Sequence, residues 1–244
     1  MTANLSKEEL ELRCKQFDEN YKYVLSRIEA AAQKAGKSAS DIQLLAATKT
    51  VPVEVINHAI GRGITLIGEN RVQELCQKYD DLDKSATRHH IGRLQTNKIK
   101  QVVGKVQMVQ SVDSLKLASE LSKRSLDMNL TTDILVEINI GNEVSKSGIP
   151  ADETEEFLHQ IATFEGIKVK GLMCIPPICE NDKEIRGFFD KMYQKFIDIS
   201  AKKIDNISMD FLSMGMSGDF EQAIQSGANI IRLGSVLFGA REYK

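Results

Sequence analysis

The first apolar residues of the chain recur every three or four positions, which is the spacing of one face of an α-helix. These positions are Phe17, Tyr21, Val24, Ile28, Ala31 and Ala35. Ser6 and Glu9 precede them at the spacing of a capping box, in which each side chain bonds the backbone N–H of the other residue. Gly36 follows them as a stop signal. The pattern predicts a long helix within residues 1–36, ahead of any strand.

Short apolar runs and helical patterns alternate along the rest of the chain. Eight runs have the length and the bounding turn residues of buried β-strands. They are residues 42–48, 64–67, 89–91, 106–109, 134–140, 169–175, 207–212 and 230–233. Helical spacing appears between them, including residues 94–103 before the fourth run and 185–199 before the seventh. Residues 141–148, after the fifth run, are small and polar and are expected to form a loop.

Eight strands that alternate with helices predict the α/β class and a (β/α)8 TIM barrel over residues 42–240. An open doubly wound sheet has the same alternation and stays the alternative. No G-x-G-x-x-G motif follows the first strand, which weighs against the dinucleotide-binding form of that sheet. We therefore expect one domain over residues 1–244, made of the N-terminal helix and the barrel.

The composition is that of an ordinary globular protein and narrows the class of partner. Of 244 residues, 42% are hydrophobic and 27% charged, and the net charge of −2 favours neither nucleic acid nor an acidic membrane. The N-terminus is polar, and no apolar run approaches the roughly 18 residues that a transmembrane helix needs. The four cysteines are scattered, and Cys174 and Cys179 have no neighbouring ligands for zinc. We expect a cytoplasmic, soluble protein without a metal.

Lys49 stands at the end of the first predicted strand, shortly before Pro52. Lysine is rarely buried without a partner, so this position needs an explanation. Either the ammonium group reaches the rim or pairs with a carboxylate, or desolvation lowers its pKa and the amine forms a Schiff base with an aldehyde. The strand alone leaves both interpretations open.

The loops after the last two predicted strands are rich in glycine and hydroxyl groups. In a TIM barrel these two loops frequently bind phosphate at the carboxyl ends of the strands. Here they are residues 213–219 and 232–235, which we call the closing loops, and each leads into a predicted helix whose first N–H groups could face an anion. Together with Lys49 they indicate a site for a phosphorylated aldehyde.

Seven segments, in order along almost the whole chain, resemble the pyridoxal-phosphate homeostasis proteins, single-domain relatives of the alanine racemase N-terminal barrel. They are ATKT (47–50), GENRVQE (68–74), HHIGRLQTNK (89–98), SKSG (145–148), GLM (171–173), LSMGMS (212–217) and RLGS (232–235). The resemblance implies a fold-type III barrel that holds pyridoxal 5′-phosphate (PLP). It also implies a role in intracellular PLP (vitamin B6) homeostasis with no established catalytic turnover.

The resemblance also implies roles for single residues. Lys49 would be the Schiff-base lysine, and Asn70 would lie near the cofactor ring. Hydroxyl and backbone N–H groups would hold the phosphate, from Ser217, Gly234 and Ser235. The family usually has Trp-His-Phe where this chain has residues 88–90, Arg-His-His. We therefore expect a different outer pocket there and a structural place for His90.

Arg232 would face the pyridine nitrogen of the cofactor. A guanidinium group can only donate hydrogen bonds, so this nitrogen would stay unprotonated and the ring would be a poor electron sink. Racemisation needs two bases on opposite faces of the substrate carbon. Lys49 can be one, but the tyrosines lie in predicted helices or in the tail, so the second base is missing. These residues are Tyr21, Tyr23, Tyr79, Tyr193 and Tyr243.

Three functions follow as hypotheses. The preferred one is a non-catalytic PLP-binding protein, with PLP-accepting apo-enzymes as candidate partners and a monomeric state. The second is a weak PLP-dependent amino-acid racemase. The third is a cofactor-free Schiff-base lyase of the aldolase kind, in which Lys49 would attack a sugar phosphate.

Overall fold

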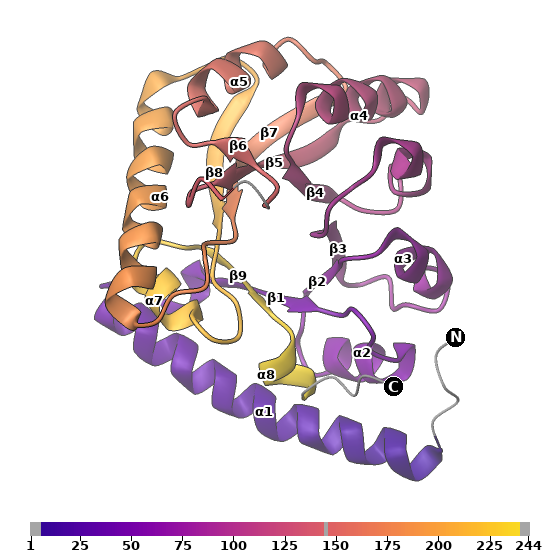
Figure 1. Ribbon diagram of the computed structural model, residues 1–244. Coiled ribbons are helices and arrows are strands. Elements are labelled where there is room, and N and C mark those ends of the chain that lie inside the picture. Colours follow the sequence, from indigo (N-terminus) through magenta and orange to yellow (C-terminus); the bar gives the residue numbers. More distant parts are fainter. Residues whose placement is uncertain (1–5, 144–145, 240–244) are drawn as a thin grey trace.

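Eight parallel strands close into a ring in the computed structural model of the chain, which describes residues 6–143 and 146–239 (Figure 1). Around the ring the order is β1 (Gln43–Ala47), β2 (Leu66–Glu69), β3 (Thr87–His90), β4 (Met108–Val112), β5 (Thr132–Asn139), β7 (Ile167–Cys174), β8 (Ile207–Ser213) and β9 (Ile230–Leu233). β4 pairs with β5 and β9 with β1, so the sheet is a barrel and the open-sheet alternative is wrong. A two-residue strand, β6 (Ile149–Pro150), pairs with β5 outside the ring.

Helices connect the strands on the outside of the ring (Figure 1). The α-helices are α1 (Lys7–Lys34), α2 (Val53–Gly61), α3 (Val72–Lys78), α4 (Leu115–Asp127), α5 (Thr154–Ile161), α6 (Asp182–Lys202), α7 (Phe220–Gln225) and α8 (Ser235–Phe238). Two 3₁₀ helices are η1 (Ala39–Asp41) and η2 (Thr96–Gln101). Parts of three predictions lie outside the described residues: positions 1–5 of the first helix, Ser145 of the SKSG segment, and position 240 of the barrel. No helix among the described residues is long and apolar enough to cross a membrane.

Several predicted strands differ from the structure in their bounds, such as β2 (66–69, predicted 64–67) and β3 (87–90, predicted 89–91), and two further elements differ in type or extent. Residues 94–103, predicted as an α-helix, contain the 3₁₀ helix η2, because apolar spacing determines which face is buried and not which hydrogen bond closes each turn. The fourth strand is Met108–Val112 rather than 106–109. Gln110 and Ser111 ended the apolar run in the sequence, yet both are buried, because this part of the barrel interior is polar.

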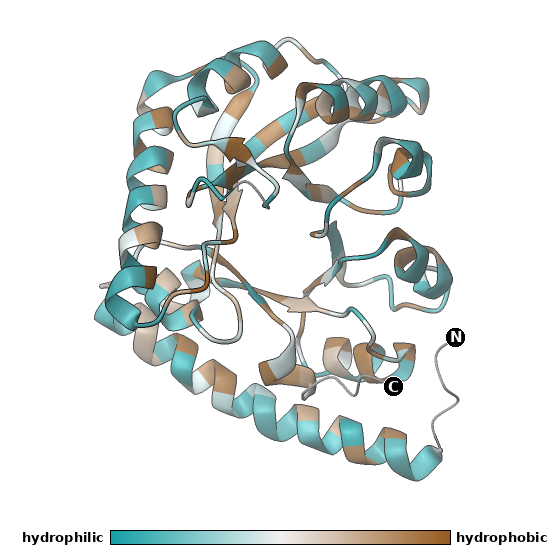
Figure 2. Ribbon diagram, in the orientation of Figure 1, coloured by the Kyte–Doolittle hydropathy of each residue, from teal (hydrophilic) through white to brown (hydrophobic). Residues whose placement is uncertain are grey.

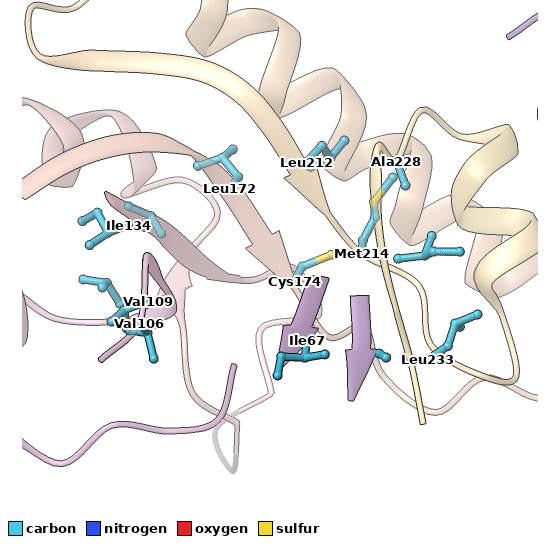
Figure 3. Packing of buried hydrophobic residues seen from close by; sticks show 14 of the residues in the cluster. Ile67, Val106, Val109, Ile134, Leu172, Cys174, Leu212, Met214, Ala228 and Leu233 are labelled. Atoms are coloured by element: carbon cyan, nitrogen blue, oxygen red, sulfur yellow. The ribbon is translucent and has the colours of Figure 1, made fainter. Parts of the chain in front are cut away.

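The main hydrophobic core lies between the strands and the helices. Figure 3 shows outward-facing side chains of the strands in this cluster, from Ile67 of β2 through Val109, Ile134, Leu172 and Leu212 to Leu233 of β9. Hydrophilic residues cover much of α1 and α6, and hydrophobic positions recur along both helices (Figure 2). This alternation is the helical pattern that the sequence predicted for both segments.

The predicted N-terminal helix is confirmed, with the Ser6–Glu9 capping box at its start. It packs along α2, α7 and α8 (Figure 1). Phe17 is fully buried and stacks on Tyr21 and on Phe238 of α8, with ring centroids 5.4 Å apart in both pairs. The helix therefore supports the short α8 at the carboxyl end of the last strand.

The interior of the barrel has an apolar end and a polar end. Inward-facing residues toward the amino ends of the strands are apolar and include Met108, Leu135, Phe211 and Ile230. Two positions further along the same strands, and so on the same face, the residues are polar and buried: Gln110, Glu137, Ser213 and Arg232. The carboxyl end of the barrel is therefore built for polar chemistry.

Replacing Phe17 with alanine should destabilise the protein by about 3–5 kcal/mol, because it removes a fully buried ring and leaves a cavity between α1 and α8. Urea unfolding followed by circular dichroism measures the change. Leu12→Ala on the same helix is the control: Leu12 is 56% exposed, and the change should stay within about 0.5 kcal/mol. Equal losses in the two variants would contradict this packing.

Glu137→Gln should make the protein more stable above pH 7. Burial, reinforced by the nearby Asp113 carboxylate, raises the pKa of Glu137 from 4.5 to about 7. Between pH 4.5 and 7 the folded protein binds the Glu137 proton more tightly than the unfolded chain does. The protonated carboxyl therefore makes its full contribution to the free energy of unfolding below pH 4.5. This contribution, at most about 3 kcal/mol, is lost as the pH rises through 7. Urea unfolding from pH 5 to 8 measures it. Glu120→Gln, at an exposed position, is the control, and parallel pH profiles for wild type and Glu137→Gln would contradict the prediction.

Candidate functional site

A cleft of about 1680 Å³ lies at the carboxyl ends of β1, β2 and β9. All six residues that the sequence selected line it: Lys49, Asn70, Ser217, Arg232, Gly234 and Ser235. The structure thus brings together positions separated by up to 186 residues in the chain (235 − 49). Their contacts with a cofactor stay predictions. No group of His, Cys, Asp and Glu within residues 6–143 and 146–239 could hold a metal ion.

Lys49 follows β1 by two residues and is half-buried in the cleft. The residue before it, Thr48, is fully buried and donates its backbone N–H to Gly68 of β2 at 2.9 Å. The residue after it, Thr50, has a φ of 64°, a left-handed conformation that costs free energy for a side chain other than glycine. The chain therefore turns sharply at Lys49, and this turn lines the cleft with Lys49, Thr50 and Val51.

The Ser217 hydroxyl joins the two closing loops. Its Oγ accepts the backbone N–H groups of Gly234 and Val236, both at 3.3 Å. Gly215, earlier in the same loop, has a φ of 92°, and its carbonyl accepts the N–H of Arg232 at 3.0 Å. Glycine is required there, since a Cβ would lie 2.6 Å from that of Ala223. The two loops form one hydrogen-bonded unit beside Lys49.

Arg232 is buried at the polar end of the barrel and begins a chain of hydrogen bonds. Its Nη1 donates to Ser213 Oγ at 2.8 Å, and its Nη2 donates to the Cys174 carbonyl at 2.9 Å. Ser213 donates to Gln110 Oε1 at 2.7 Å, and Gln110 Nε2 lies 2.8 Å from His89 Nδ1. The chain crosses the barrel interior from β9 through β8 and β4 to β3.

The last member of this chain is a neutral histidine. Burial lowers the pKa of His89 to about 4. An amide nitrogen only donates, so Nδ1 of the neutral ring is the acceptor and Nε2 carries the hydrogen. Every bond in the chain then has a defined direction, from the guanidinium group to the imidazole. The sequence analysis missed Gln110, and the only signal for it was a polar residue interrupting a predicted strand.

Neither His89 nor His90, the two histidines of the third predicted strand, lines the cleft. His89 faces a second cavity, of about 610 Å³, among residues from the amino ends of the strands. His90 is fully buried, and burial lowers its pKa to about 4. The structure therefore gives both residues interior positions, as we expected for His90. Asn70 does line the cleft, and its buried Oδ1 has no hydrogen-bond partner among the described residues.

A buried ion-pair cluster lies beside the turn at Lys49, and the sequence analysis missed it. The side chains of Lys78 in α3 and Glu69 at the end of β2 are 5% and 2% exposed, and Lys78 Nζ lies 2.7 Å from Glu69 Oε1. Glu74, one turn earlier in α3, lies 3.2 Å from the same ammonium group. Glu74 and Lys78 have the i,i+4 spacing of an ordinary surface pair. The predicted second strand ended at residue 67, so the sequence analysis placed Glu69 after the strand, whereas it is the last residue of β2.

Comparisons with known proteins agree with this geometry. The family model "Alanine racemase, N-terminal domain" matches residues 24–242. The pyridoxal phosphate homeostasis protein of Aquifex aeolicus is 42% identical over 221 residues, which are 90% of this chain and 96% of that protein. A crystal structure of a protein of unknown function from Bifidobacterium adolescentis superposes with a TM-score of 0.89 at 35% identity, covering 93% of this chain and 96% of that one.

A further solved structure contains a ligand. It is PipY of Synechococcus elongatus with PLP bound, which is similar with a TM-score of 0.75 at 29% identity and covers 82% of this chain and 93% of its own. The family match over most of the chain and the 42% identity to the Aquifex aeolicus protein decide the assignment. The chain is a member of the alanine racemase N-terminal domain family and belongs to its pyridoxal phosphate homeostasis proteins.

Proposed function

We propose that the protein binds PLP through a Schiff base on Lys49 and acts in intracellular PLP homeostasis without catalytic turnover. The observation that supports this most directly is a single cleft lined by Lys49 and by both closing loops. Membership of the family supports the same conclusion, since a relative, PipY, has been solved with PLP bound. Bound PLP supplies an aldehyde with which a lysine amine can form a Schiff base, and a ring that can withdraw electrons.

The closing loops have the donors that a phosphate needs. Ser217 Oγ already accepts two N–H groups, so both of its lone pairs are used and its own hydrogen points elsewhere. No acceptor among the described residues receives this hydrogen. A phosphate oxygen in the cleft would be a suitable acceptor for it and for the backbone N–H and hydroxyl of Ser235. The N–H groups of Gly234 and Val236 would be shared between Ser217 Oγ and the phosphate. We infer that Ser217, Gly234 and Ser235 bind the phosphate.

Arg232 has the geometry to contact the cofactor ring. It uses two of its five N–H donors on Ser213 and Cys174 and also lines the cleft. The hydrogen-bond chain that ends at His89 holds the guanidinium plane in place, so its other donors have a defined direction. Facing a pyridine nitrogen, it would keep that nitrogen unprotonated. We infer that Arg232 binds the ring and limits its capacity as an electron sink.

The surroundings of Lys49 support binding without turnover. A racemase needs a second base opposite the lysine. The tyrosines among the described residues are Tyr21, Tyr23, Tyr79 and Tyr193, and none of them lines the cleft; Tyr243 lies outside the described part. The two histidines near the site are buried away from the cleft, and burial lowers their pKa values to about 4. Among the described residues, the cleft thus offers Lys49 no second base that is a tyrosine or a histidine.

Lys49→Ala should abolish covalent attachment of PLP while the protein stays folded, because the side chain is half-buried in an open cleft rather than enclosed in the core. Borohydride reduction followed by peptide mass spectrometry should locate the cofactor on Lys49 in the wild type and nowhere in the variant. Lys100→Ala, at an exposed position of η2, is the control and should keep the attachment.

Two results would contradict the proposal. Wild-type protein that stays colourless and gains no absorbance with PLP would favour the aldolase-type lyase. Exchange of D- and L-amino acids at high protein concentration, abolished by Lys49→Ala, would show that the protein is a racemase rather than a binding protein.

Arg232→Ala should weaken PLP binding by about tenfold or more, the loss expected for a hydrogen bond to a charged donor. Titration of PLP followed by absorbance measures the dissociation constant, and urea unfolding measures stability. Ser213→Ala is the comparison: it removes one bond to the guanidinium group and leaves the group itself, so binding should weaken less. Unchanged affinity in Arg232→Ala would contradict the place assigned to this residue.

A further inference from the structure

We propose that Glu74 and Lys78 are positioning residues for Lys49: they hold the peptide groups on both sides of Lys49 and so determine where its amine lies in the cleft. The inference rests on the proposed function, in which Lys49 attaches the cofactor. It concerns a part of the protein, helix α3, that contributes no residue to the phosphate or ring contacts proposed above.

The contacts of Lys78 reach the peptide bond that precedes Lys49. Its Nζ donates to the Thr48 carbonyl at 2.9 Å, to Glu69 Oε1 at 2.7 Å and to Glu74 Oε2 at 3.2 Å. The three hydrogens of the ammonium group are thereby used, and the side chain is 5% exposed. The Thr48 carbonyl belongs to the same planar peptide unit as the Lys49 nitrogen. Lys78 therefore fixes the orientation of that unit.

Glu74 holds the peptide bond that follows Lys49. Its Oε2 accepts the backbone N–H of Thr50 at 2.6 Å, the shorter of its two contacts. This N–H belongs to the peptide unit of the Lys49 carbonyl. Thr50 is in the left-handed region, at a φ of 64°, and such a residue persists only where its surroundings hold it. Both peptide bonds of Lys49 are therefore held, each by a side chain of α3.

Glu69, at the end of β2, is the third member of the cluster. Its Oε1 accepts from Lys78 and also from the Thr48 hydroxyl at 2.8 Å, while the same hydroxyl lies 3.1 Å from the Gly68 carbonyl. Thr48 is thus bound through its N–H, its carbonyl and its hydroxyl, and it is fully buried. The backbone of Thr48 is therefore held in place, and this also holds the backbone from which the Lys49 side chain extends.

A purely stabilising ion pair would not need these backbone contacts. Buried ion pairs contribute little net stability, because desolvation of the charges offsets their attraction. This cluster differs from a purely stabilising ion pair in its position, because its side chains bond the two peptide groups on either side of Lys49. Positioning of a reactive group within about 1 Å can change a rate by up to about a hundredfold.

The test separates the reaction of Lys49 from binding in the cleft. The rate constant for Schiff-base formation with PLP, followed by stopped-flow absorbance, reports on the lysine. Affinity for pyridoxine 5′-phosphate, which has an alcohol in place of the aldehyde, reports on the cleft without a covalent bond. Glu74→Ala should slow Schiff-base formation by about tenfold or more and leave the affinity for pyridoxine 5′-phosphate within about twofold.

Glu74→Gln is the conservative variant. Its amide oxygen can still accept from Thr50, so the rate should return to within about threefold of the wild type if the hydrogen bond is what matters. Glu155→Ala, which breaks an exposed ion pair between α5 and Lys202 of α6, is the control and should change neither quantity. A Gln variant as slow as the Ala variant would overturn the assignment of Glu74.

Lys78→Met alone would leave Glu69 as an unpaired buried carboxylate, so it is combined with Glu69→Gln. The double variant removes the donor to the Thr48 carbonyl without leaving a lone charge in this pair, and it should also slow Schiff-base formation. If it and Glu74→Ala react at the wild-type rate and lose only stability, the cluster is structural and the inference is overturned. Wild-type protein that binds pyridoxine 5′-phosphate but forms no Schiff base on Lys49 would overturn the proposed function as well.

Discussion

The pairing of β9 with β1 is the interaction on which the site depends, because it closes the barrel and places the last strand beside the first. Ala46 of β1 is in register with Leu233 of β9, so the residues that follow each strand end emerge next to one another. Lys49 and Ser235 lie three and two positions beyond this pair. A Cβ at Gly234 would lie 3.5 Å from the carbonyl of Ala47, which shows how near the second closing loop passes to β1. Barrel closure thus brings Lys49 and the second closing loop to the same end of the barrel.

One directed chain of hydrogen bonds joins the buried side chains of Arg232, Ser213, Gln110 and His89 inside the barrel. A buried guanidinium group is costly unless its donors are paired, and the low dielectric of the interior strengthens each bond that is made. Arg232 donates hydrogen bonds to Ser213 and to the Cys174 carbonyl, and the Ser213 hydroxyl donates in turn to Gln110. The neutral His89 ends the chain as an acceptor. Under the proposed function, Arg232 held in this way would be ready for the cofactor ring before any ligand arrives, which lowers the ordering cost of binding.

Hydrophobic periodicity predicted the order and type of the elements because every strand buries an outward face under helices. Hydrophobic periodicity failed where polar side chains are buried inside the barrel. The predicted fourth strand stopped before Gln110 and Ser111, although both residues are buried in β4. The six residues of the cleft were found through the motifs and the family resemblance. Lys78 was not found, because its i,i+4 spacing from Glu74 is also that of a solvated pair. Its burial arises only when α3 packs against the end of β2 and meets Glu69, which is a tertiary event that no local pattern records.

The cluster around Lys78 also explains how a strongly turned backbone is tolerated next to Lys49. Thr50 adopts a left-handed conformation, and the buried Glu69 and Lys78 side chains lie under the same turn with the partly exposed Glu74. Each feature alone destabilises a fold. Together they are joined by hydrogen bonds, since Glu74 accepts from Thr50 and from Lys78, and Lys78 donates to Thr48 and to Glu69. A strand continued straight beyond Ala47 would need none of these charges, but it would carry Lys49 along the barrel wall. Under the inference drawn for Glu74 and Lys78, the turn and its charges direct the lysine into the cleft instead.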